Sequence, residues 1–535
     1  MSIEEFEQLD QQANKLLEAE NKIEYLENKL KSLEPLVHLF AKNTKTGGKK
    51  SYSQNLDLII IRSLADGRSA AAIHDFLQVF ADQFPVMLEL ENDQVEYSLP
   101  TVRYIEQMRD CLPDFNQARL KDFVTESEVL TIHTDDSPAK NQGRNYTSLG
   151  ISNEMGEYVN VGFLQNDNKS SDGICKAMTK VLDESDLHSV IYSKLSTDIA
   201  IMSDAAPAQK LANKLYFERS SKSFENSSFE VLQNAGVCLM HTTQNAERYA
   251  YENLSKTAQD GLQSLKLVFG SRNCSGFHRV SLKDKLNDAL GVQNRSIMLT
   301  DLGSRFAVHS TNARAVILHR TEVSVALNST NKASDHFDRL KSLLVNQWDQ
   351  FALEVGAFAL IFFGIISPFH TVVSKILPWV EGKNAIEKAR AQLKTLTETR
   401  DPLLNLFGII NETNVSQKTV ELKIELSKLA HDNRSAILAG AQIRDMAKGA
   451  LKKLEKDTNV LLEQNFADNA ILPLTNRRAE GSFSTFKWNE RKFYNISKEL
   501  LVNITISKVN NLSKFISEMV RETFVGNSRL IIYLI

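Results

Sequence analysis

Three short apolar runs near the middle of the chain constrain its fold more than any other feature. They are separated by stretches rich in turn-forming residues, and they read VLTIHTDD, YTSLGIS and YVNVGFLQ. Runs of this length and spacing predict an antiparallel meander of β-strands. The chain then alternates between helix and strand patterns, in the order ICKAMTKVLDES, DIAIMSD, AAPAQKLANKLYFE and NAGVCLMH. Residues 122–279 are therefore expected to form the first part of an α/β core around a mixed sheet.

Residues 280–470 follow a mainly helical pattern with few strand signals. A short apolar run with a proline, ILPLTN, and one more helix come next, so residues 471–520 are expected to return to the core. A large all-α insertion thus divides the α/β core. Within it, residues 355–374 carry no charged side chain, but their continuous apolar part is shorter than the ~20 residues that a membrane span needs. A buried core helix and no membrane contact are predicted, and a membrane-anchored protein is the alternative.

The N-terminal region is expected to be helical in two steps. Residues 1–40 carry an apolar residue at every seventh position, which predicts a coiled coil and a homodimer or higher oligomer; the positions are Leu9, Leu16, Ile23, Leu30 and Val37. A helix that packs on its own domain is the alternative. Residues 51–121 predict helices, two of them joined by a turn at 65–68, a layout that allows a helix-turn-helix. The second helix offers few side chains that read bases, so a plain helical hairpin is favoured.

Composition is that of a soluble globular protein and excludes a strongly basic one. Of 535 residues, 42% are apolar and 24% are charged, with a net charge of −3. Any contact with nucleic acid must therefore use local basic patches. The four cysteines are too sparse for a disulfide framework, and the acidic N-terminus has no secretory signal, so a reducing interior is expected.

Three carboxylates stand at positions that suit a metal site. Asp135 stands at the end of the first strand run, Asp204 ends DIAIMSD, and Glu480 lies at the helix start in LPLTNRRAEGSFSTF. Mg²⁺ prefers oxygen ligands, and a pair of such ions supports phosphoryl transfer on nucleic acid. Asp136 competes with Asp135 for the first position. A single Asp after a strand is more often a turn former or a helix cap, so only the combination indicates a site.

The ordered motifs of the chain resemble the catalytic core of eukaryotic cut-and-paste DDE transposases. The motifs are TIHTDDSP with the three-strand meander, then IMSDAAP, CLMH and LPLTNRRAEGSF. The resemblance is closest to the group with a helical insertion before the last acid (hAT, P element and Kolobok-like). It implies an RNase H-like fold in which Asp135, Asp204 and Glu480 bind two Mg²⁺ ions, or Mn²⁺, for DNA strand cleavage and strand transfer. Transposon-end DNA as the partner and the nucleus as the location follow from the same resemblance.

Many enzymes of this group carry a Cys-x-x-His pair shortly after the second acid, and Cys238 and His241 match it. From the residues alone, this pair together with Cys274 and His278 has spacings that suit a tetrahedral zinc site. A buried thiol beside a histidine that braces the next helix is favoured, and zinc is not expected. Participation of His241 in the active site is a third interpretation.

Basic and aromatic residues surround Glu480, a pattern that suits contact with nucleic acid. Basic side chains bind phosphates and aromatic rings stack on unpaired bases; the candidates are Arg477, Arg478, Lys487 and Trp488. The alternative is a helix with an aromatic core face and a solvated basic face. No recognisable zinc-finger module precedes the core. A catalytically silent nuclear DNA-binding or scaffold protein with the same fold is therefore the second hypothesis.

Overall fold

The computed structural model describes most of the chain in separate segments. They are residues 41–43, 52, 54–83, 95–97, 99–139, 144–166, 170–204, 206–223, 235–270, 286–287, 289–291, 307–329, 335–410, 415–430, 433–492 and 498–523. The coiled coil expected over residues 1–40 lies outside these segments, and so do Cys274 and His278. The coiled coil therefore stays a prediction, and the structure does not test the alternative of a zinc site that includes Cys274 and His278.

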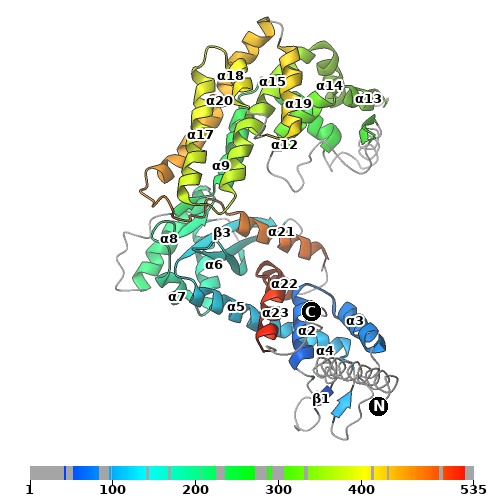
Figure 1. Cartoon of the computed structure of the whole chain (residues 1–535), viewed down its shortest axis with the longest axis vertical. Coiled ribbons are helices and arrows are strands. Elements are labelled where there is room, and N and C mark those ends of the chain that lie inside the picture. The colour runs from blue at the N-terminus through cyan, green and yellow to red at the C-terminus, as the bar shows by residue number, and fades with distance from the viewer. Residues whose placement is uncertain are drawn as a thin grey trace, which may run out of the picture.

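A mixed sheet lies in the middle of the molecule (Figure 1). Within the described segments it has five strands in the order β5-β4-β3-β6-β7. They span Leu130–Ala139 (β3), Arg144–Asn153 (β4), Tyr158–Asn166 (β5), Ile201–Ser203 (β6) and Ala235–Val237 (β7). The first three strands form the antiparallel meander, whereas β6 runs parallel to β3 and β7 parallel to β6. The prediction of a mixed α/β sheet with a large helical part is confirmed.

One face of the sheet packs on helices that come before and after the meander in the sequence. These are α5 (Leu112–Glu126), α6 (Ser171–Glu184), α7 (His188–Ser193) and α8 (Pro207–Ser223). Because side chains alternate between the two faces of a strand, Leu130 and Ile132 of β3 reach this core together with Leu149 and Ile151 of β4.

The opposite face packs on two helices from the C-terminal part of the chain, α21 (Arg477–Lys492) and α22 (Lys498–Val509). Phe483 and Phe486 lie one helical turn apart on α21. They form a small core with Tyr146 of β4 and Phe163 of β5. The aromatic face of α21 is therefore buried, and this packing lays the start of α21 across the sheet.

The large helical part stands at one end of the molecule (Figure 1). Its described helices are α9 (Leu239–Glu252), α10 (Lys256–Leu265), α12 (Val308–Leu318), α13 (Arg320–Asn328), α14 (Asp335–Asn346), α15 (Trp348–Ile361), α16 (Ser367–Val373), α17 (Trp379–Glu398), α18 (Pro402–Ile409), α19 (Gln417–Leu429) and α20 (Asn433–Leu462). Helix α10 packs on α14 and α15, although it precedes residue 280.

The apolar stretch of the helical part runs through its centre. Every residue of α15 from Phe351 to Ile361 is buried, and α15 contacts α12, α19 and α20. By length and composition alone, one helix in the described segments, Trp348–Val373, is apolar enough to cross a membrane, and 78% of its most apolar window is buried inside the protein. This burial is that of a core helix, as the sequence predicts.

The N-terminal part is a small helical unit, and a helix from the C-terminal part of the chain contributes to its core. It contains α2 (Gln54–Ala65), α3 (Ala70–Gln83) and α4 (Val102–Gln107), with a strand pair β1 (Ala41–Asn43) and β2 (Val95–Tyr97). Helix α23 (Leu512–Thr523) inserts Leu512 and Ile516 into the same core. Helix α3 has no Lys or Arg and exposes Phe76 and Val79. This composition favours the plain hairpin over a base-reading helix.

The helical part leaves the sheet and returns to it at neighbouring points. Helix α9 begins at Leu239, directly after β7, and the backbone N–H of Leu239 donates to the carbonyl oxygen of Leu474 at 2.9 Å. Leu474 lies three residues before α21. Because the exit and the return of the chain are adjacent, the insertion does not separate α21 from the sheet.

Candidate carboxylate site

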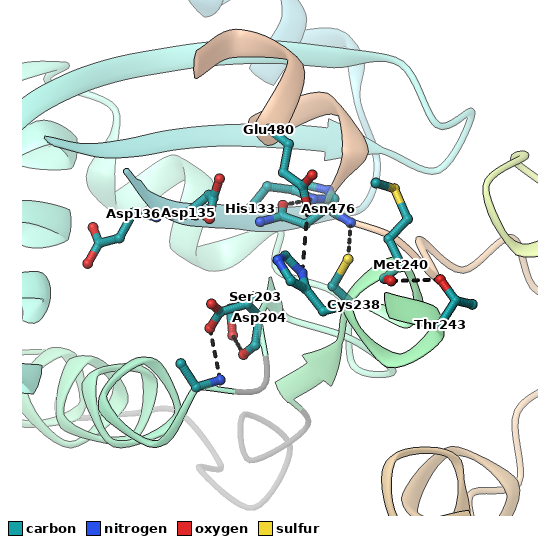
Figure 2. A network of polar contacts seen from close by, with 12 residues as sticks. His133, Asp135, Asp136, Ser203, Asp204, Cys238, Met240, Thr243, Asn476 and Glu480 are labelled. Atoms are coloured by element: carbon teal, nitrogen blue, oxygen red, sulfur yellow. Dashed lines mark hydrogen bonds and ion pairs between the residues drawn. The ribbon is translucent and has the colours of Figure 1, made fainter. Parts of the chain in front are cut away.

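Asp135 and Asp136 are adjacent on β3, but their side chains point to opposite faces of the sheet (Figure 2). The carboxylate of Asp136 accepts a hydrogen bond of 2.5 Å from Thr147 Oγ1, and Thr147 is its register partner on β4. Asp135 instead lies on the face that α21 covers, where it interacts electrostatically with Glu480. Of the two candidates, the geometry brings only Asp135 toward the other acids.

Asp204 directly follows β6, the parallel neighbour of β3. In the register of this pair, His133 stands opposite Met202, so two residues further along the two strands are Asp135 and Asp204. The Asp204 carboxylate also accepts the backbone N–H of Ala206 at 2.9 Å, just before α8 begins. The turn-forming role of an Asp after a strand is thus present, together with proximity to Asp135.

Glu480 lies in the first turn of α21, and a buried asparagine holds that turn on β3. Asn476 is fully buried, and its Nδ2 donates to the carbonyl oxygen of Thr134 at 2.7 Å. The backbone carbonyl oxygen of Asn476 accepts the backbone N–H of Glu480 at 3.0 Å. A buried amide is stable only when its polar atoms are bonded. Asn476 therefore fixes the start of α21, and with it Glu480, next to the strand that carries Asp135.

His133 holds the side chain of Asn476 in place from the same face of β3 that carries Asp135. Its Nδ1 lies 3.2 Å from Asn476 Oδ1, and its Nε2 lies 2.8 Å from Ser152 Oγ. Because an amide oxygen only accepts, the proton is on Nδ1, and Ser152 donates to Nε2. Burial lowers the pKa of His133 to about 4, although the bond to Asn476 acts in the opposite direction. The ring is therefore neutral and positions Asn476.

The negative charges of Glu480 and Asp204 both act on Asp135. Burial raises the pKa of Asp135 well above its usual range, and the charges of Glu480 and then Asp204 raise it further. Like charges so close together disfavour ionisation unless a cation compensates them. The chemistry of this donor set, three carboxylates on one face of the sheet, therefore fits a hard divalent cation such as Mg²⁺.

Cys238 and His241 also lie close to Glu480, and Figure 2 shows Cys238 beside Asn476. His241 Nδ1 and Glu480 Oε1 are 3.5 Å apart, and one ligand atom from each of Cys238, His241 and Glu480 lies within 4.8 Å of the other two. Burial, and next the charge of Glu480, raise the pKa of the Cys238 thiol to about 12. Its sulfur accepts the backbone N–H of Asn476 at 3.1 Å. The thiol is thus neutral and braces Asn476, and His241 contacts the third acid directly.

The four predicted nucleic-acid contacts differ in their surroundings. Arg477 and Arg478 are exposed at the start of α21, whereas Lys487 is half-buried. Trp488 is 52% exposed, but Lys508 Nζ lies 4.4 Å from its ring centroid. One face of this ring is therefore covered by a cation, which leaves the two arginines as the most accessible candidates.

Two residues of the site, His133 and Asn476, were not among those predicted from the sequence. Each carried a local signal: His133 interrupts an apolar strand run, and Asn476 stands between a proline-marked run and a helix start. No protein-family model matches the chain, and no curated protein matches it either. The interpretation of the site therefore depends on its geometry and electrostatics.

Proposed function

We propose that the chain is a DDE transposase-like protein that cleaves and transfers DNA strands with Mg²⁺. The observation that carries this proposal is the convergence of Asp135, Asp204 and Glu480, which come from distant parts of the sequence and interact at one place. Three carboxylates that meet on one face of a sheet are suited to holding divalent cations.

The arrangement of the sheet supports an RNase H-like core. A three-strand antiparallel meander is extended by two parallel strands on the side of β3. The first acid stands on the central strand, the second follows its parallel neighbour, and the third lies on a helix across the same face. This order of acids along the chain and across the sheet is what the sequence resemblance implies for such enzymes.

Each residue of the site would have a distinct role in the proposed reaction. Asp135, Asp204 and Glu480 would hold the cations, which supply activation of water or a 3′-hydroxyl group and stabilisation of the leaving oxygen. Asn476 keeps Glu480 in reach of the strand acids, and His241 orients the Glu480 carboxylate through their contact. DNA as the substrate and the nucleus as the location belong to the same proposal.

A pair of aspartate variants tests the proposal. Asp204→Ala removes one cation ligand, so nicking of supercoiled plasmid DNA in Mg²⁺ is expected to fall to background. Asp136→Asn changes an acid of the same strand that faces away from the site, so nicking is expected to continue at the wild-type rate.

Equal nicking by Asp204→Ala and the wild-type protein would show that the acids do not act as one site. If the wild-type protein does not nick DNA in Mg²⁺ or Mn²⁺, the catalytically silent DNA-binding or scaffold protein becomes the better account. Circular dichroism of each variant checks that the fold is intact.

A further inference from the structure

A groove beside the carboxylate site separates the sheet from the helical part. Its volume is about 600 Å³. Three pieces of chain form its walls: the turn between β4 and β5, the end of α16 with the residues that follow it, and the segment that leads into α21. The lining residues used below are Lys375, Ile376, Leu472, Arg477 and Arg478. We call this feature the basic groove.

The basic groove is positively charged. Lys375, Arg477 and Arg478 line it, and none of its lining residues is acidic. Among the described residues, no Asp or Glu forms an ion pair with any of the three cations. The charge of Arg477 adds to burial in lowering the pKa of His370 nearby. An unbalanced cluster of this kind attracts anions.

The basic groove is lined by residues that neighbour the carboxylate site. Arg477 and Arg478 lie within the same helical turn as Glu480, and a turn of helix rises about 5.4 Å. Gly481, the next residue, lines the groove, and so does His133, which contacts Asn476 beneath the acids. An anion in the groove is therefore held close to the place where the acids would bind a reacting phosphate.

The shape of the groove indicates a polymer and not a small anion. A single phosphate would occupy a small share of 600 Å³, and the cations come from two separate parts of the protein. Between them the groove has apolar walls, with Ile376 on one side and Leu472 on the other. A nucleic-acid strand offers both kinds of surface, because it presents phosphates in series and apolar faces of sugars and bases.

We propose that the basic groove binds the phosphates of the DNA strand next to the reacting phosphate, with Lys375, Arg477 and Arg478 as the contacts. The inference rests on the proposed function and deepens it by naming where the substrate strand runs. It also assigns a role to the helical part, because Lys375 belongs to that part and faces the sheet across the groove.

Binding of a labelled single-stranded oligonucleotide to the full-length protein tests the basic groove. Fluorescence anisotropy is measured over a range of salt concentrations in Ca²⁺, so that binding is observed without cleavage. Lys375→Ala and Arg478→Ala are each expected to weaken binding about tenfold, as for a lost hydrogen bond to a charged group. Each is also expected to reduce the slope of log K against log salt by about 0.7, the value for one single-strand phosphate contact.

Arg400→Ala is the matched control. Arg400 is exposed and follows the C-cap residue of α17, whereas Lys375 lies just before the start of this helix. Because α17 has 20 residues, about 30 Å of helix separates the two positions. Its affinity and salt slope are expected to equal those of the wild-type protein. Loss of the same amount of affinity in all three variants would indicate a diffuse charge effect and overturn the proposal.

The remaining outcomes separate this inference from the proposed function. Groove variants with wild-type affinity and slope in a protein that does nick DNA would overturn the groove and leave the function standing. Groove-dependent binding in a protein that never nicks DNA would support the groove and contradict the function. If inorganic phosphate at low millimolar concentration displaces the oligonucleotide completely, the groove is a site for a small anion only, and the proposal fails.

Discussion

Asp135 and Asp136 show that a shift of one position along a strand determines whether a carboxylate can belong to the site. They are chemically identical neighbours, and the sequence left the choice between them open. Alternation along β3 sends Asp136 to Thr147 and Asp135 to the face that carries Glu480. The residues on which this face depends, His133 and Asn476, were harder to foresee, because their role comes from hydrogen bonds between segments far apart in sequence.

The buried neutral state of His133 predicts a loss of stability in acid. An unfolded histidine takes up a proton near its ordinary pKa of 6.5, whereas the folded one resists protonation down to about 4. The free energy of unfolding should therefore be unaffected above pH 6.5 and fall by about 3 kcal/mol as the pH decreases through this window.

Urea unfolding of the wild-type protein and His133→Gln at pH 7.5 and pH 4.5 checks this prediction. Asp135, whose pKa is raised, changes stability in the opposite direction as the pH falls, so the comparison uses the difference between the two proteins. The variant should lose less stability than the wild type between the two pH values. An equal loss would mean that His133 titrates normally in the folded state.

Helix α21 illustrates what periodicity predicts well and what it misses. Its position after the apolar run and the presence of Glu480 in its first turn agree with the sequence analysis. The aromatic core face is present, and the basic start of the helix is exposed, as both interpretations of its sequence require. Phe483 and Phe486 are buried, whereas the two arginines at its start are exposed. The cover of Trp488 by Lys508 was not predictable, since Lys508 belongs to another helix.

Packing of the aromatic residues of α21 on the sheet predicts a large difference between two substitutions on one helix. Phe486 is buried and its ring centroid lies 4.9 Å from that of Tyr146. Phe486→Ala should lower the free energy of unfolding by about 3–5 kcal/mol, because it leaves a cavity. Trp488→Ala changes a half-exposed ring and should cost about 1 kcal/mol or less. Thermal or urea denaturation measures both, and equal losses would contradict the packing described here.

At the scale of the whole molecule, the question is how an acid that follows a large helical insertion rejoins the sheet. The structure answers it through the adjacent exit and return of the chain, where Leu239 bonds to Leu474. The fold class and the insertion were predictable, because hydrophobic periodicity reports helices and strands segment by segment. The packing of α23 into the N-terminal core was not predictable, because no local sequence pattern shows which distant helix contributes to a given core.

The central claim is that the three acids act as one cation site although an insertion separates the third from the others. The most direct test is the rate of Mg²⁺-dependent plasmid nicking by Glu480→Gln, with Glu463→Gln, an exposed glutamate before α21, as its control. We predict background nicking for Glu480→Gln and the wild-type rate for Glu463→Gln. Nicking by Glu480→Gln at the wild-type rate would contradict the account.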